Sequence, residues 1–179
     1  VAAFIGDALV QGDETGSLAA RVADALGWQS VNLGRGGTGY VTSAGTAACG
    51  LDYCAPFPMM AADAIAAKPD VVVVSGGIDD GTTDVSAAAG MLFGQLHKEL
   101  PKAKVIVVAP MSRASLVPDA LTALRSEVRA AARTAGVSYV DVGNPLADHP
   151  ELFASDGVHL TKGGYAALSK LVAQAIGKL

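Results

Sequence analysis

The sequence predicts an α/β fold in which helices cover both faces of a five-stranded parallel sheet, the doubly wound, flavodoxin-like class. Short apolar runs alternate along the chain with segments of helical spacing. Residues 70–75 include four consecutive valines, which is typical of a strand buried on both faces, so we place this strand at the centre of the sheet. The 179 residues are 51% hydrophobic, which suits a single domain over residues 1–179.

Each predicted strand is a short apolar run, and several of these runs end at glycine or proline. The first run ends at Gly6, the second precedes a glycine-rich stretch over residues 34–39, and the fourth ends at Pro110. The predicted strands are residues 2–5, 28–33, 70–75, 105–109 and 137–142.

The predicted helices lie between and after these strands. Residues 17–26 place Leu18, Val22 and Leu26 on one face, and Gly27 ends that helix. Pro118 opens the longest helix, because proline is well suited to a first helical turn. The predicted helices are residues 17–26, 59–67, 85–100, 118–135 and 161–179.

Charge and hydropathy exclude two classes of partner. The net charge is -4 and the basic residues are scattered, so we expect no nucleic-acid partner. The apolar runs fall short of the roughly 20 residues that span a bilayer, so we expect no membrane insertion of this domain. The chain starts at Val1 on an apolar segment, and we expect a trimmed piece of a larger membrane or secreted protein.

The two cysteines lie close together, in Cys49-Gly-Leu-Asp-Tyr-Cys54. A local disulfide would close a short ring and would indicate an oxidising, extracellular, secreted or cell-surface location. Two free thiols in a cytoplasmic protein are the alternative. The spacing is poor for zinc without further ligands nearby, so we expect no metal and no cofactor.

Ligands of doubly wound folds bind where the carboxyl ends of the strands meet the loops, and candidate catalytic residues follow there. Asp156-Gly-Val-His159 precedes the last helix. A carboxylate that holds an imidazole in one tautomer makes it a base for a hydroxyl nucleophile. Such a pair is common by chance, and a surface turn is the plain alternative.

The loop after the first strand makes the pattern specific. Phe4-Ile-Gly-Asp-Ala-Leu-Val-Gln-Gly12 resembles the Gly-Asp-Ser-Leu block of the SGNH/GDSL hydrolases, with Ala8 in place of the serine. Asp156 and His159 match the Asp-x-x-His block of that family. The resemblance implies the SGNH hydrolase fold and a catalytic triad at Ala8, Asp156 and His159.

Two further stretches resemble the family's oxyanion-hole blocks. Asn32-Leu-Gly-Arg-Gly-Gly37 places Gly37 where a backbone N–H of the family faces the oxyanion. Gly77-Ile-Asp-Asp80 places Asp79 where the family has an asparagine donor, and a carboxylate there would repel the developing charge. The backbone N–H of Ala8 completes the implied oxyanion hole, and we expect Asp80 to hold a loop by hydrogen bonding.

An active relative would attack an acyl carbonyl with the serine, and Ala8 has no atom to do so. We interpret Ala8 as a deliberate inactivating substitution of an esterase. A natural pseudoenzyme is the alternative, which Asp79 favours because a second functional side chain then differs. Asp79 as the native residue of an active subgroup, or as a second deliberate change, stays open.

The expected substrate is an acetyl or short-chain ester of a carbohydrate, because the chain has no long insertion to form a lid. We expect Arg35, Tyr40 and Met111 to contact it, with Ser112 and Arg113 in the pocket wall. The alternatives are an O-acetyltransferase with the same triad and a non-catalytic glycan-binding module. Nucleotide binding is disfavoured: Gly34-x-Gly36-x-x-Gly39 follows the wrong strand, and the first loop has no phosphate-binding glycine run.

Overall fold

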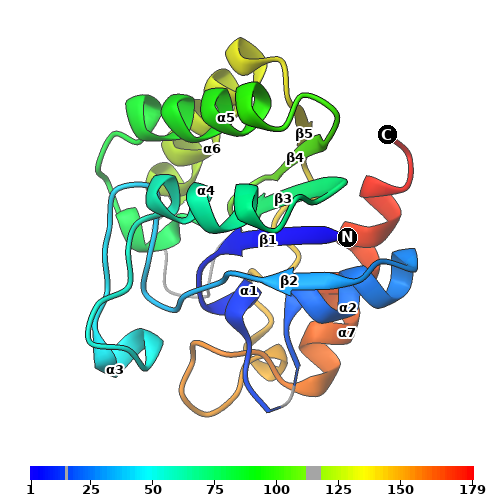
Figure 1. The fold of residues 1–179 in the computed structure, drawn as a ribbon. Helices are drawn as coiled ribbons and strands as arrows, with labels where there is room; N and C mark the ends of the chain where they lie inside the picture. The colour runs from blue at the N-terminus through cyan, green and yellow to red at the C-terminus, as the bar shows by residue number, and fades with distance from the viewer. Residues whose placement is uncertain (15, 112–117) are drawn as a thin grey trace.

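A computed structural model describes residues 1–14, 16–111 and 118–179 and confirms the predicted fold class. Its five strands are all parallel, in the order β2-β1-β3-β4-β5 (Figure 1). The run of valines forms β3 at the centre of the sheet, as predicted. The strands are β1 (Ala2–Gly6), β2 (Ser30–Asn32), β3 (Val71–Ser75), β4 (Lys104–Val108) and β5 (Ser138–Val140).

Helices cover both faces of this sheet (Figure 1). One face packs on α2 (Leu18–Leu26) and α7 (Lys162–Ile176), and the other packs on α4 (Phe57–Ala66), α5 (Ser86–Glu99) and α6 (Pro118–Ala135). Residues of one strand alternate between the two cores: Val73 packs with the first, and Val72 and Val74 pack with the second. This alternation follows from the period of two in a strand, and it explains why the central strand is apolar on both of its faces.

The ends of the predicted helices are set by local capping groups. The Ser17 side chain accepts a hydrogen bond from Ala20 N at the start of α2, and Gly27 ends the helix in the left-handed conformation. Thr161 caps α7 in the same way through Gly164 N. No helix in the described part of the chain is both long and apolar enough to cross a membrane.

Four short helical segments in the described part of the chain lie outside the predicted helices and strands. Each lasts about one turn, which is too short to produce a hydrophobic period in the sequence. They are α1 (Ala8–Gln11), α3 (Thr46–Cys49), η1 (Ile78–Asp80) and η2 (Pro150–Leu152). Two of them, α1 and η1, follow the carboxyl ends of neighbouring strands, and they carry Ala8 and Asp79.

Candidate active site

Ala8 lies at the sharp turn from β1 into α1. Asp7 caps that helix: its Oδ1 accepts a hydrogen bond from Leu9 N at 3.1 Å. Gly6 precedes it against β3, where a Cβ would overlap the Ser75 carbonyl oxygen and the Val10 side chain. The turn therefore brings residue 8 to the carboxyl edge of the sheet, where Ala8 is 4% exposed.

Asp156 and His159 form a hydrogen-bonded pair in the loop before α7. His159 Nδ1 lies 2.8 Å from Asp156 Oδ2, and Asp156 Oδ1 accepts from Val158 N at 2.8 Å and His159 N at 3.0 Å. The ends of the loop are joined by Ala154 N, which donates to the His159 carbonyl at 2.9 Å. Both groups of the pair are therefore fixed by the backbone of one short turn.

The electrostatics of the pair favour an ionised carboxylate beside the imidazole. The hydrogen bond from the His159 side chain, followed by those from Val158 N and His159 N, lowers the pKa of Asp156 from 3.8 to about 2. With the proton assigned to Nδ1 by this hydrogen bond, Nε2 is the acceptor nitrogen of the neutral ring. The His159 side chain is 27% exposed, so Nε2 can act as a base toward a group in solvent or in a cleft.

A buried tyrosine links the segment of Ala8 to the segment of His159. Burial is the main cause that raises the pKa of the Tyr165 hydroxyl to about 12, and carboxylates of Asp13, Asp7 and Asp156 raise it further. The hydrophobic core that contains Tyr165 also includes Leu9 and Val10 of α1 and Leu160, the residue after His159, so the two segments pack on the same core.

Two backbone N–H groups are available where the sequence places an oxyanion hole. Among residues 1–14, 16–111 and 118–179, no acceptor is hydrogen-bonded to Ala8 N or Gly37 N. Gly37 has φ 72°, a left-handed conformation that glycine adopts without strain. A pair of free N–H donors is the usual means of stabilising an oxyanion in acyl transfer.

The loop after β2 is fastened to the loop after β1 by Asn32, whose structural role the sequence analysis missed. Asn32 Nδ2 donates to the Val10 carbonyl at 2.9 Å, and Asn32 Oδ1 accepts from Gly34 N at 2.9 Å. Arg35 N donates to the Gly6 carbonyl at 2.8 Å. An asparagine two residues before the first glycine of a glycine-rich stretch is the signal that could have indicated these hydrogen bonds.

Asp79 and Asp80 follow β3 in η1 and have different surroundings. Asp80 is buried, and its carboxylate accepts from Tyr40 N at 2.6 Å, Val41 N at 3.0 Å and Thr42 N at 2.9 Å. The prediction that Asp80 holds a loop is confirmed. Asp79 is half-buried, and its backbone carbonyl accepts from Thr42 Oγ1 at 3.2 Å. A role for the Asp79 side chain in the oxyanion hole stays a prediction.

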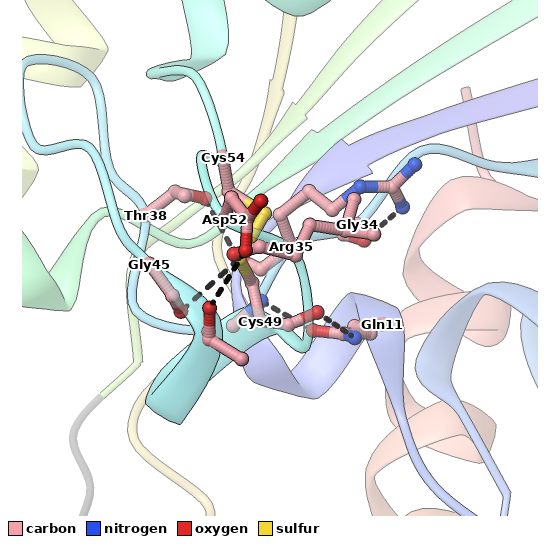
Figure 2. The surroundings of a disulfide bond; sticks show 11 residues. Gln11, Gly34, Arg35, Thr38, Gly45, Cys49, Asp52 and Cys54 are labelled. Carbon is pink, nitrogen blue, oxygen red and sulfur yellow. Dashed lines mark hydrogen bonds between the residues drawn. A yellow bond between two sulfur atoms is a disulfide. The ribbon is translucent and has the colours of Figure 1, made fainter.

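The predicted disulfide joins Cys49 to Cys54, next to the glycine loop (Figure 2). The two flanks of its ring are paired by Ala44 and Cys54, whose backbones exchange hydrogen bonds of 3.0 and 2.8 Å. The described residues contain no cluster of three or more His, Cys, Asp or Glu side chains that could hold a metal.

The three predicted substrate contacts are placed differently. Tyr40 is 1% exposed and packs edge-on against Phe57 and Phe93, and burial raises the pKa of its hydroxyl well above the ordinary value. Met111 is also buried. Their positions in the sequence alone did not reveal this packing, and contact of these two residues with a substrate stays a prediction. Ser112 and Arg113 lie outside the described residues.

Arg35 is the predicted contact that reaches a surface hollow. It lines a cavity of about 230 Å³ together with the exposed side chains of Leu51, Tyr53 and Met59. Its Nη1 donates to the carbonyl of Gly34 at 2.7 Å. A larger hollow of about 660 Å³ lies between α2 and α7, and none of the predicted site residues lines it.

The similarity to known proteins covers both segments of this site, the one with Ala8 and the one with His159. Residues 4–167 match the GDSL-like Lipase/Acylhydrolase family, a range that includes Ala8 and His159. A GDSL lipase of Mycobacterium tuberculosis is 30% identical over 189 residues, which cover 97% of this chain and 80% of that protein.

Solved structures with a similar fold include a family two carbohydrate esterase from Cellvibrio japonicus. It has a TM-score of 0.77 at 18% identity, and the match covers 99% of this chain and 60% of that one. The M. smegmatis aryl esterase has a TM-score of 0.70 at 17% identity, covering 99% and 98%. The carbohydrate acetylesterase Est24 from Sinorhizobium meliloti has a TM-score of 0.70 at 19% identity, covering 99% and 98%.

Proposed function

Because the chain belongs to the GDSL-like lipase/acylhydrolase family, we propose that it is a serine ester hydrolase whose nucleophile position, residue 8, carries alanine. The observation that carries the proposal is the Asp156–His159 pair, with Nδ1 2.8 Å from the carboxylate. Its Asp-x-x-His spacing matches the block that carries the catalytic base in this family, and two backbone N–H groups hold the carboxylate in place. The free N–H groups of Ala8 and Gly37 add support.

The proposed chemistry requires serine at position 8. Its Oγ would attack the ester carbonyl while His159 Nε2 takes the proton, and Asp156 would stabilise the imidazolium that forms. The N–H groups of residue 8 and Gly37 would bind the oxyanion. His159 would then return the proton to the leaving alcohol, and water would hydrolyse the acyl-serine in a second cycle of the same steps.

With Ala8 in place, the first bond cannot form. Loss of the nucleophile from a triad costs on the order of a millionfold in kcat. We propose that the protein as it stands retains the binding site and has lost turnover. The change is a deliberate substitution in this proposal, since alanine removes the hydroxyl and leaves the backbone unaltered.

The proposed substrate is an acetyl or other short-chain ester of a carbohydrate, met outside the cell. Two proteins of similar fold are named as a carbohydrate esterase and a carbohydrate acetylesterase, which supports the alcohol. The Cys49–Cys54 disulfide supports an oxidising location. Arg35, at the rim of its surface hollow, is the proposed contact for the sugar.

A glycan-binding module without catalytic function is the second candidate. The observation that favours it is the combination of Ala8 with Asp79, because two side chains of the expected machinery then differ. It predicts that a glycan ester still binds and that restoring serine restores no turnover.

The test is hydrolysis of an activated aryl acetate by the protein, by Ala8→Ser, and by Ala8→Ser combined with His159→Ala. A matched control is available in His149, whose Nδ1 also lies 2.8 Å from a carboxylate, that of Glu151. We expect Ala8→Ser to raise turnover at least about a hundredfold, His159→Ala to abolish the gain, and His149→Ala to leave it unchanged.

Two outcomes of that assay would contradict the esterase proposal. One is a folded Ala8→Ser protein that stays silent, also with Asp79→Asn added, which would favour the binding module. The other is a gain in turnover that His159→Ala does not remove, which would mean that the hydrolysis does not use the proposed base.

A further inference from the structure

Gln11 occupies a central position next to the proposed oxyanion hole. It lies three residues after Ala8, at the last position of α1, and its side chain is half-buried. Figure 2 shows its amide beside Cys49, between the disulfide ring and the glycine loop. The side chain therefore stands where three separate segments of the chain meet.

Both ends of the Gln11 amide are used, each by a different segment. Oε1 accepts a hydrogen bond from Gly36 N in the glycine loop. Nε2 donates to the Cys49 carbonyl at 3.3 Å (Figure 2). A neutral amide can donate and accept at once, whereas a carboxylate or an ammonium could satisfy only one of the two partners.

The glycine loop has little room to move relative to this contact. A Cβ at Gly36 would overlap the Ala48 carbonyl oxygen, and a Cβ at Gly37 would lie 2.7 Å from Ala48 Cβ and 3.2 Å from Ala44 Cβ. The α3 segment thus packs against one side of the loop, and the Gln11 amide binds Gly36 N. Gly37 N, the proposed oxyanion donor, belongs to the next peptide along the chain.

We propose that Gln11 is a positioning residue of the oxyanion hole, which sets the direction of Gly37 N–H by holding Gly36 N and the Cys49 carbonyl. This assignment rests on the proposed esterase function. It assigns Gln11 no contact with the substrate: the side chain acts through the glycine loop. Because it lies on α1, Gln11 also fixes the distance between the two oxyanion donors, Ala8 N on its own helix and Gly37 N on the loop.

The test uses Gln11→Met, which keeps the length of the side chain and removes both hydrogen bonds. Gln95→Met is the matched control, because Gln95 is exposed on α5. In the Ala8→Ser background we expect Gln11→Met to lower kcat by about 10- to 100-fold with KM changed by less than about threefold. A purely structural role would lower the melting temperature and leave the kcat of the folded fraction unchanged.

A second measurement needs no turnover. In the ¹⁵N-labelled protein with Ala8, we expect hydrogen exchange at Gly36 N to be at least about tenfold faster in Gln11→Met, with the β3 amides unaffected. Unchanged exchange at Gly36 N would overturn the assignment. An active Ala8→Ser enzyme whose kcat is unchanged by Gln11→Met would also overturn it. An inactive Ala8→Ser enzyme would instead contradict the proposed esterase function.

Discussion

Replacement of Asp80 by asparagine should strongly destabilise the protein, although it exchanges a single oxygen for an amide nitrogen. Asp80 is 4% exposed, and its two oxygens accept three backbone N–H groups from residues 40–42. Oδ2 accepts the hydrogen bond from Tyr40 N, and Oδ1 accepts those from the N–H groups of the next two residues. Asparagine keeps one acceptor oxygen and turns an NH₂ group toward the donors that the other oxygen served.

The magnitude follows from the hydrogen bonds that the substitution removes. A hydrogen bond to a charged group contributes roughly 1.5–3 kcal/mol, and a buried N–H without an acceptor costs about 1–3 kcal/mol. Asp80→Asn removes either the shortest of the three bonds or both of the others, so we expect a decrease of about 3 kcal/mol in the free energy of unfolding. For a chain of this length that corresponds to a melting temperature lower by roughly 6–12 °C.

The assay is urea unfolding followed by circular dichroism, with Asp63→Asn as the control. Asp63 is exposed on α4, so its substitution should change stability by less than about 0.5 kcal/mol. If Asp80→Asn fell within about 0.5 kcal/mol of this control, the three hydrogen bonds would not stabilise the fold as argued.

Three further predictions concern the disulfide, the glycine loop and the Asp156 turn. Replacing Cys49 and Cys54 by serine opens a ring of sequence separation 5, and calorimetry should show a free energy of unfolding lower by about 2 kcal/mol. An unchanged free energy of unfolding would refute the entropic explanation. In urea unfolding, Gly37→Ala should lower the free energy of unfolding by at least about 1 kcal/mol more than Gly27→Ala does. Both glycines have a positive φ, but only the Gly27 site has room for a Cβ, so equal decreases would contradict this explanation. Asp156→Asn should lose less than about 1 kcal/mol, since the side chain is 50% exposed. The pKa of Asp156 is depressed in the folded state, so the stability difference between the protein and Asp156→Asn should be present above about pH 4 and vanish as the pH falls through about 2. A stability difference that persists below that pH would have another cause.

The sequence predicted the layers of the fold well, because its longest elements have clear periods. Helix α2 ends before Gly27, as predicted, and it begins after Ser17, one residue later than the predicted start. The strands near the edges were less well bounded: residues 28–33 were expected to form a strand, and β2 spans Ser30–Asn32. This edge strand has no fully buried position, so its apolar pattern is weak.

The candidate site was predicted where local sequence determines geometry. Asp156 and His159 are three residues apart, and one turn brings them together. The burial of Tyr40 was not predicted, because its ring packs on Phe57 and Phe93, neighbours that no local pattern reveals. Gln11 went unnoticed for the same reason, since its partners Gly36 and Cys49 come from distant segments.

The most direct test of the central claim is covalent labelling of residue 8. The protein and its Ala8→Ser variant would be treated with a fluorophosphonate, and the modified peptide would be mapped by mass spectrometry. The account predicts one adduct on residue 8 of the Ala8→Ser variant, none on the protein with Ala8, and slower labelling when His159→Ala is added. A folded Ala8→Ser protein that takes no label, or takes it at another residue, would contradict the claim that this site is that of a serine hydrolase.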